Sequence, residues 1–103
     1  MISEQMKKTI VEKIRSVASP VSIVLFGSQV YGDPGDNSDL DIFVLEHEVK
    51  SKIDEVNKMI IALKDIPIAK DIVVASENEY AFYRKEAGSI YKTISEKGEV
   101  IFG

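Results

Sequence analysis

Apolar residues recur along the chain with two different periods, and these periods predict its helices and strands. A spacing of three or four positions predicts a helix over residues 3–17 and a second, longer helix over residues 48–64. Short runs of β-branched and aromatic residues predict three strands, at residues 21–26, 39–45 and 69–75.

Residues that break or cap regular structure separate these elements. Pro20 ends the first helix, and residues 32–38, with the sequence GDPGDNS, are dense in turn-forming residues. Two further helices are predicted near the C-terminus. One begins at residues 76–79, which have the form of a capping box, and the other lies between Ser89 and Gly98.

The predicted order is helix, strand, loop, strand, helix, strand, helix, helix. The second and third strands are joined by a long helix, whereas the first two are joined by a loop. This order favours the α/β class, with a small mixed β-sheet and helices packed on it. At 103 residues without an internal linker, residues 1–103 are expected to form a single domain.

The composition excludes several classes of protein and site. The chain is 45% hydrophobic and 29% charged, which is typical of a soluble globular protein. It has no cysteine and one histidine, so disulfides, cysteine-held metals and multi-histidine metal sites are excluded. Because it also shows no signal peptide and no membrane-spanning run, a cytoplasmic location is expected. Its net charge of −4 disfavours nucleic acid as a partner.

Asp39 and Asp41 stand at alternate positions of the second predicted strand. Alternate side chains share a face, so the period that buries Leu40, Ile42 and Val44 sets the two carboxylates side by side. At about 5 Å they would repel by roughly 3 kcal/mol at an effective dielectric near 20. That face is either open to water or neutralised by a cation, and oxygen ligands of this kind suit Mg²⁺.

Asp71 precedes the apolar residues 72–75 of the third predicted strand. An unpaired aspartate is costly to bury. If the third strand lies beside the second, this carboxylate joins the first two, and three converging carboxylates are what a two-metal phosphoryl-transfer site requires. The alternative is an exposed position at the start of the strand, with Lys70 or Lys64 as an ion-pair partner.

Gly27 and Ser28 directly follow the first predicted strand. Glycine lets a backbone approach a phosphate closely, and a helical turn starting here would create an anion-binding N-terminus. The alternative is a plain junction between strand and turn. Ten residues, 29–38, separate Ser28 from Asp39, so one loop would bring a phosphate cradle and the carboxylate pair to the same end of the sheet.

Together these residues resemble the signature of the nucleotidyltransferase superfamily to which polymerase beta belongs. That signature is Gly-Ser, a spacer, Asp-x-Asp and a third carboxylate on a later strand. The whole chain is similar to the stand-alone minimal nucleotidyltransferases, including residues 70–74 (KDIVV), 88–91 (GSIY) and 97–101 (KGEVI). Gln29 differs from the pattern, because many members carry a basic residue there.

The resemblance implies the polymerase-beta-like fold and the transfer of a nucleoside monophosphate, AMP from ATP, to a hydroxyl group with release of pyrophosphate. Asp39 and Asp41 would hold two magnesium ions. Asp71 would ligate one of them and accept the proton of the hydroxyl. Gly27 and Ser28 would bind the β- and γ-phosphates. The resemblance also implies a HEPN-domain protein as partner, with this chain as the antitoxin of a toxin–antitoxin pair that modifies a partner tyrosine.

Two other functions stay open: the same transfer to a small molecule or an RNA end, and a non-catalytic module that sequesters a partner. Small-molecule members usually add a second domain for the acceptor, and the acidic balance argues against RNA. The sequence does not settle the oligomeric state. His47, Arg84 and Lys85 are interpreted as solvated residues. Four aromatic residues are interpreted as core rather than as a platform for adenine: Tyr80, Phe82, Tyr83 and Tyr91.

Overall fold

The computed structural model describes residues 2–27 and 39–103. The predicted loop at residues 32–38 and the predicted site residue Ser28 lie outside the described residues. The elements, in chain order, are α1 (Glu4–Val17), β1 (Pro20–Phe26), β2 (Leu40–Glu46), α3 (Lys52–Ala62), β3 (Lys70–Ser76), α4 (Glu77–Tyr83), α5 (Ile90–Lys97) and β4 (Glu99–Phe102).

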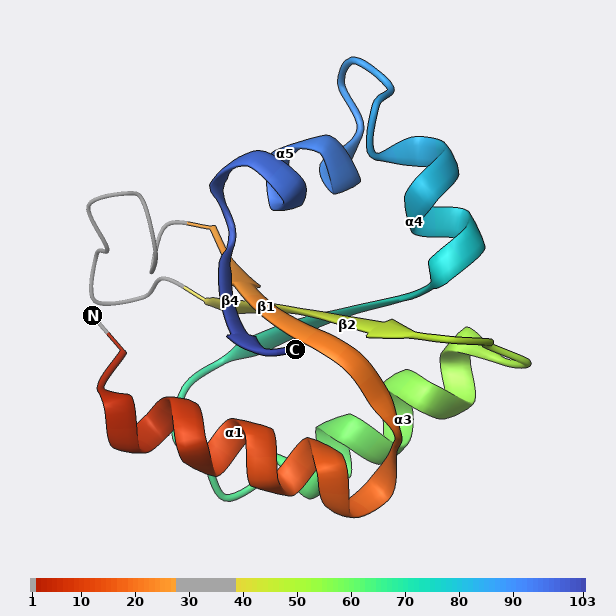
Figure 1. The fold of residues 1–103 in the computed structure, drawn as a ribbon. Coiled ribbons are helices and arrows are strands. Elements are labelled where there is room, and N and C mark those ends of the chain that lie inside the picture. The colour runs from red at the N-terminus through yellow and green to blue at the C-terminus, as the bar shows by residue number, and fades with distance from the viewer. Residues whose placement is uncertain (1, 28–38) are drawn as a thin grey trace.

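The strands form one mixed sheet in the order β3-β2-β1-β4. β1 pairs antiparallel with β2 and with β4, whereas β2 and β3 are parallel, with α3 as the crossover between them. Helices α1 and α3 cover one face of the sheet, and α4 and α5 cover the other (Figure 1). The predicted fold class, a small mixed sheet with helices packed on it, is confirmed.

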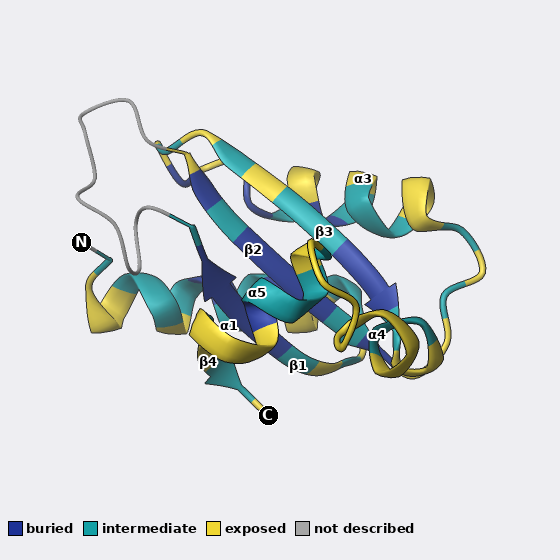
Figure 2. Ribbon diagram, turned by 90° about the horizontal axis from the view of Figure 1, so that it is seen from above, coloured by how far each residue is buried: buried dark blue, intermediate teal, exposed yellow. Residues whose placement is uncertain are grey.

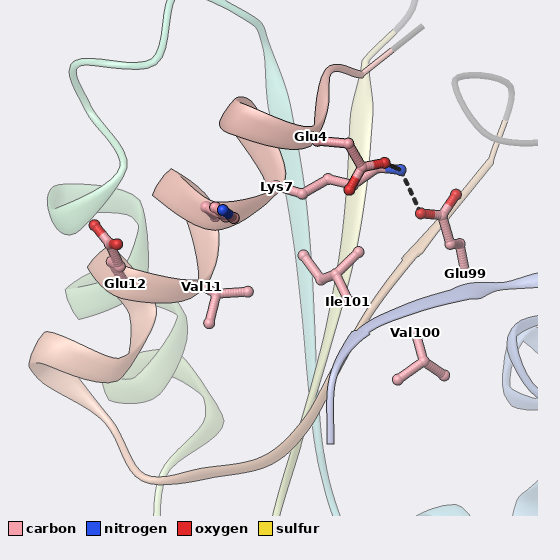
Figure 3. A pocket seen from close by; sticks show the side chains of 8 residues that line it. Glu4, Lys7, Val11, Glu12, Glu99, Val100 and Ile101 are labelled. Atoms are coloured by element: carbon pink, nitrogen blue, oxygen red, sulfur yellow. Dashed lines mark hydrogen bonds and ion pairs between the residues drawn. The ribbon is translucent and has the colours of Figure 1, made fainter.

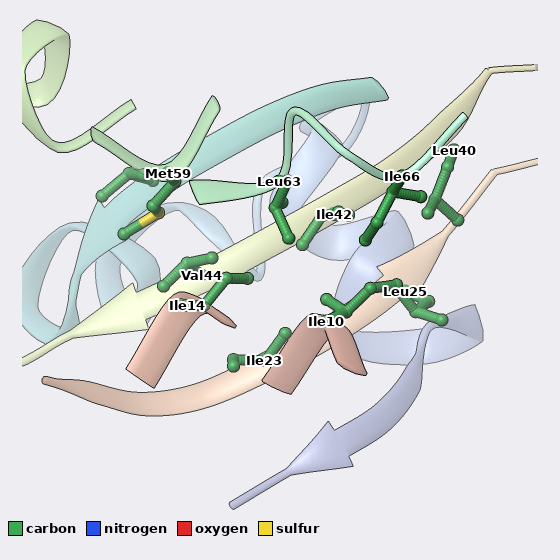
Figure 4. Packing of buried hydrophobic residues seen from close by; sticks show 11 residues of the cluster. Ile10, Ile14, Ile23, Leu25, Leu40, Ile42, Val44, Met59, Leu63 and Ile66 are labelled. Atoms are coloured by element: carbon green, nitrogen blue, oxygen red, sulfur yellow. The ribbon is translucent and has the colours of Figure 1, made fainter. Parts of the chain in front are cut away.

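The larger core lies between the sheet and helices α1 and α3 (Figure 4). Leu40, Ile42 and Val44 of β2 are fully buried there, as their alternation with the aspartates predicts. Ile10 and Ile14 of α1 pack against them. Each such side chain contributes roughly 1.5–3 kcal/mol on burial. Their burial therefore fixes which face of β2 is turned to the core.

A smaller core lies on the opposite face, beneath α4 and α5 (Figure 2). Phe43 is its centre, and the rings of Tyr80 and Tyr91 pack on it with centroids at 5.1 and 5.8 Å. Two of the four aromatic residues therefore pack on the core, as predicted, although both are only half-buried. The other two are not, since Phe82 and Tyr83 are exposed and contact each other on the surface.

Serine side chains cap the helices at their N-termini. Ser76 and Ser89 accept hydrogen bonds from the backbone N–H groups of Glu79 and Tyr91, so both predicted starts are confirmed. The capping box is only half formed, because the Glu79 carboxylate receives hydrogen bonds from Lys52 and Tyr91 instead of returning to the cap. The long helix starts at Lys52 rather than at residue 48, because Ser51 is its N-cap.

The last strand, β4, is absent from the expectations drawn from sequence. It has only four residues, and Glu99 and Val100 are exposed. Lys7 of α1 anchors it, with its ammonium between the carboxylates of Glu4 and Glu99 at 3.0 and 2.5 Å (Figure 3). These three residues are among those that line an open cavity of about 380 Å³ between α1 and β4. No helix in the described part of the chain is long and apolar enough to cross a membrane.

Candidate active site

Asp41 and Asp71 are register partners in the parallel ladder of β2 and β3. Partners at the same level of a parallel ladder direct their side chains to the same face. Phe43 and Val73, two residues further along each strand, belong to the core beneath α4 and α5, so both aspartates lie on that face. The structure therefore brings these two carboxylates together at the N-terminal ends of adjacent strands.

The charge of this pair is not balanced within the sheet. Burial raises the pKa of Asp41 above its ordinary value, and the negative charges of Asp71 and then Asp39 raise it further. Lys70, the cation next along the chain, donates its hydrogen bonds to the carbonyls of Ile66 and Ile68, each at 2.8 Å. The ion pair between Asp71 and Lys70, considered as the alternative from sequence, is therefore replaced by contacts to the preceding loop.

Asp39 lies immediately before β2 and is exposed, as Asp71 is. In residues 2–27 and 39–103, no group of three or more acidic, histidine or cysteine side chains is arranged to hold a metal ion. The structure thus provides two carboxylates in register, those of Asp41 and Asp71, and a third, that of Asp39, just before the start of β2. Their oxygen donors fit Mg²⁺, and an unbalanced pair of like charges favours a cation. Convergence of all three on one ion stays a prediction.

Gly27 directly follows β1 and lies beside Asp41. The antiparallel register sets Phe26 opposite Asp41, so the backbones of β1 and β2 are close at the residue before Gly27. The φ angle of Gly27 is +88°, a left-handed conformation that favours glycine. A Cβ atom at this position would overlap Oδ2 of Asp41 and lie 3.0 Å from its Cγ. The sequence predicts contact of this glycine with a phosphate and does not predict its contact with Asp41.

The weaker candidates lie away from this end of the sheet. His47 follows the opposite end of β2, where its side chain is 81% exposed and its Nδ1 lies 3.1 Å from Oε1 of Glu77. Arg84 follows α4, with its guanidinium 6.0 Å from the ring centre of Tyr80. Both are surface residues, as predicted.

The family model described as "Polymerase beta, Nucleotidyltransferase" matches residues 8–103. The chain belongs to this nucleotidyltransferase family. The match covers every residue of the candidate site. Nucleotidyl transfer is therefore the reaction class of the chain, and the geometry at Asp41 and Asp71 can be interpreted as that of a nucleotidyltransferase.

Two solved structures share the nucleotidyltransferase fold seen here. One is a crystal structure of the toxin–antitoxin MntA-HpeT with two Asp-to-Glu mutations, 21% identical to this chain with a TM-score of 0.64. The other is described as a toxin–antitoxin with AMP-PNP, 22% identical, also with a TM-score of 0.64. Each alignment covers 94% of this chain and 73% of the other. No curated protein is similar enough in sequence to count as a match.

Proposed function

We propose that this nucleotidyltransferase transfers AMP from ATP to a hydroxyl group on a partner protein, in a reaction that depends on Mg²⁺. The observation that carries the proposal is the register of Asp41 with Asp71 on one face of the sheet, at the end where Gly27 follows β1. Two carboxylates that can bind metal ions thus lie beside a residue without a side chain. This arrangement suits a bound triphosphate and its metal ions.

The proposed roles of the residues follow from their positions. Asp39 and Asp41 hold two Mg²⁺ ions, and Asp71 is a further ligand. When bound, the ions neutralise the triphosphate and lower the pKa of the attacking hydroxyl.

Asp71, which is exposed, accepts the proton of that hydroxyl at its carboxylate. The hydroxyl oxygen forms a bond to the α-phosphorus, the bond from that phosphorus to the bridging oxygen breaks, and pyrophosphate leaves. Ser28 and the Gly27 backbone bind the β- and γ-phosphates.

The proposed acceptor is a tyrosine of a HEPN-domain toxin, with this chain as the antitoxin in the cytoplasm. Support comes from the two structures of similar fold, both described as toxin–antitoxin and one as holding AMP-PNP. The net charge of −4 also disfavours counterion-driven binding to a polyanion such as RNA.

The test uses ATP labelled at the α-phosphate, Mg²⁺ and a HEPN-domain protein. We expect label on the partner protein and an equal amount of pyrophosphate, both lost on chelation of the metal. Asp71→Asn should abolish both signals. Asp65→Asn, an exposed aspartate outside the sheet, is the matched control and should leave them unchanged.

Other outcomes would replace the proposal. Label on RNA or on a small molecule, with none on the protein, would identify a different acceptor for the same chemistry. Tight binding of the HEPN protein without any release of pyrophosphate would indicate a non-catalytic module that sequesters its partner.

A further inference from the structure

We infer that Gly27 is a positioning residue for the Asp41 carboxylate: its missing side chain leaves the space that this metal-binding group occupies. The inference rests on the proposed function, and it assigns the glycine a task other than contact with phosphate. In the structure, the three atoms nearest to a Cβ at Gly27 all belong to Asp41, and they are Oδ2, Cγ and Cβ.

Neither residue can withdraw from this contact easily. The ladder between β1 and β2 pairs Phe26 with Asp41, so the two backbones are held together next to Gly27. Phe26 and Phe43, the neighbours of these residues on the same face, are buried beneath α4 and α5. The steric overlap caused by a Cβ atom at Gly27 would therefore be relieved mainly by rotation of the Asp41 side chain.

The direction of that rotation is unfavourable. β2 lies between β1 and β3 in the sheet, so Gly27 lies on one side of Asp41 and Asp71 on the other. A carboxylate displaced from the β1 side moves toward a second negative charge. The side chain would then leave the position in which it can share a cation with Asp71.

A role in metal positioning and a role in phosphate contact predict different defects. If Gly27 makes room for Asp41, a methyl group there weakens metal binding even without nucleotide, and ATP binding suffers only as a consequence. If Gly27 serves phosphate alone, metal binding without nucleotide is unchanged and the KM for ATP rises at every metal concentration.

The chain offers a matched control for the backbone. Gly88 also has a positive φ, +81°, but a Cβ atom there would meet nothing within 4 Å. Gly88→Ala thus reports the strain of alanine in a left-handed conformation, whereas Gly27→Ala reports that strain and the contact with Asp41.

The first measurement is thermal unfolding of the metal-free chain. We expect Gly27→Ala to lower the midpoint by at least about 5 °C more than Gly88→Ala does. In an Asp41→Ala background, which removes Oδ2 and Cγ, most of this excess should disappear. Equal losses for the two glycines, or an excess that persists without the carboxylate, would overturn the inference.

The second measurement is Mn²⁺ binding without nucleotide, followed by electron paramagnetic resonance. We expect Gly27→Ala to weaken binding about tenfold or more and Gly88→Ala to leave it unchanged. Wild-type affinity in Gly27→Ala would overturn the inference. If the wild-type chain itself binds no Mn²⁺, the proposed function fails instead, and the unfolding experiment alone then decides the steric role of Gly27.

Discussion

Strand β2 carries one acidic pair near each of its ends, and the two pairs lie on opposite faces of the sheet. Asp41 lies beside Asp71 on the face of α4 and α5. Glu46, at the other end, lies on the face of α1 and α3 and interacts with Glu55 of α3. Both pairs bring two carboxyl groups together, but the repulsion between the two groups is relieved in different ways.

In the glutamate pair, the surroundings favour a proton on Glu46. Glu46 is 6% exposed. Burial, the hydrogen bond with Glu55 and the charge of Glu55 raise the pKa of Glu46 to about 7. Its Oε1 is buried and has no hydrogen-bond partner among the described residues, which adds to the cost of a negative charge on this carboxyl group. Burial also raises the pKa of Glu55, but its hydrogen bonds with Lys58 and Glu46 lower it by more, so Glu55 is the anion.

The aspartate pair differs in its exposure to solvent. Asp71 and Asp39 are exposed, and Asp41 is only half-buried, so the site is open to an ion from solvent. A raised pKa therefore does not by itself mark an active site in this protein. What separates the two pairs is access and the presence of a side-chain-free residue, Gly27, next to the open one.

The largest expected effect comes from removing one charge of the open pair. Asp41→Asn should lower nucleotide transfer by at least about a hundredfold, because loss of even an outer metal partner costs ten- to a hundredfold. Steady-state pyrophosphate release measures this. The metal-free variant should be as stable as the wild type or more stable, since repulsion with Asp71 is relieved. A clear loss of stability would show that the carboxylate is structural.

The buried pair should respond to pH in the opposite sense to a salt bridge. Because the pKa of Glu46 rises from 4.5 to about 7 on folding, its contribution is fully present below pH 4.5 and is lost as the pH rises to about 7. Glu46→Gln keeps a hydrogen-bond donor without the charge. Its gain in unfolding free energy over the wild type should be about 1–3 kcal/mol larger at pH 8 than at pH 5. Urea unfolding at both values tests this, with the exposed Glu48→Gln as control.

Metal should stabilise the protein only through the open pair. At ten times its dissociation constant, Mg²⁺ should add about 1.4 kcal/mol to the free energy of unfolding in the wild type and nothing in Asp41→Asn. Because the pKa of Asp41 is raised, protons compete earlier than for an ordinary aspartate, so the gain should fade on mild acidification. A metal response that survives Asp41→Asn but not Glu46→Gln would reverse the assignment of the two pairs.

The smallest effect concerns the cation beside the buried pair. Lys58 lies 2.7 Å from Glu55 and its charge lowers the pKa of Glu46. Lys58→Gln should therefore move the titration midpoint of Glu46 upward by less than about one pH unit, because Lys58 is partly exposed and screened. Carbon-detected NMR of the Glu46 carboxyl measures this, and a downward shift would contradict the proposed arrangement.

The local features of this protein could be predicted from its sequence. Alternation along residues 39–45 is enough to assign Leu40 and Ile42 to the core and Asp41 to the other face, because side chains of a strand alternate whatever the strand pairs with. The serine caps are equally local, since each acts on a backbone group two or three residues away.

The pairings do not follow from local patterns, because they depend on which strands become neighbours. The sequence places Asp71 beside Asp41 only on the condition that the third strand lies next to the second, and through the family resemblance. Asp71 reaches Asp41 only through the parallel register of β2 and β3. Residues 99–102 form a strand only because β1 offers an open edge for backbone hydrogen bonds. The raised pKa of Glu46 and the contact of Gly27 with Asp41 arise in the same way. Their partners are brought near by packing between elements that are distant in the sequence, and no local pattern encodes that distance.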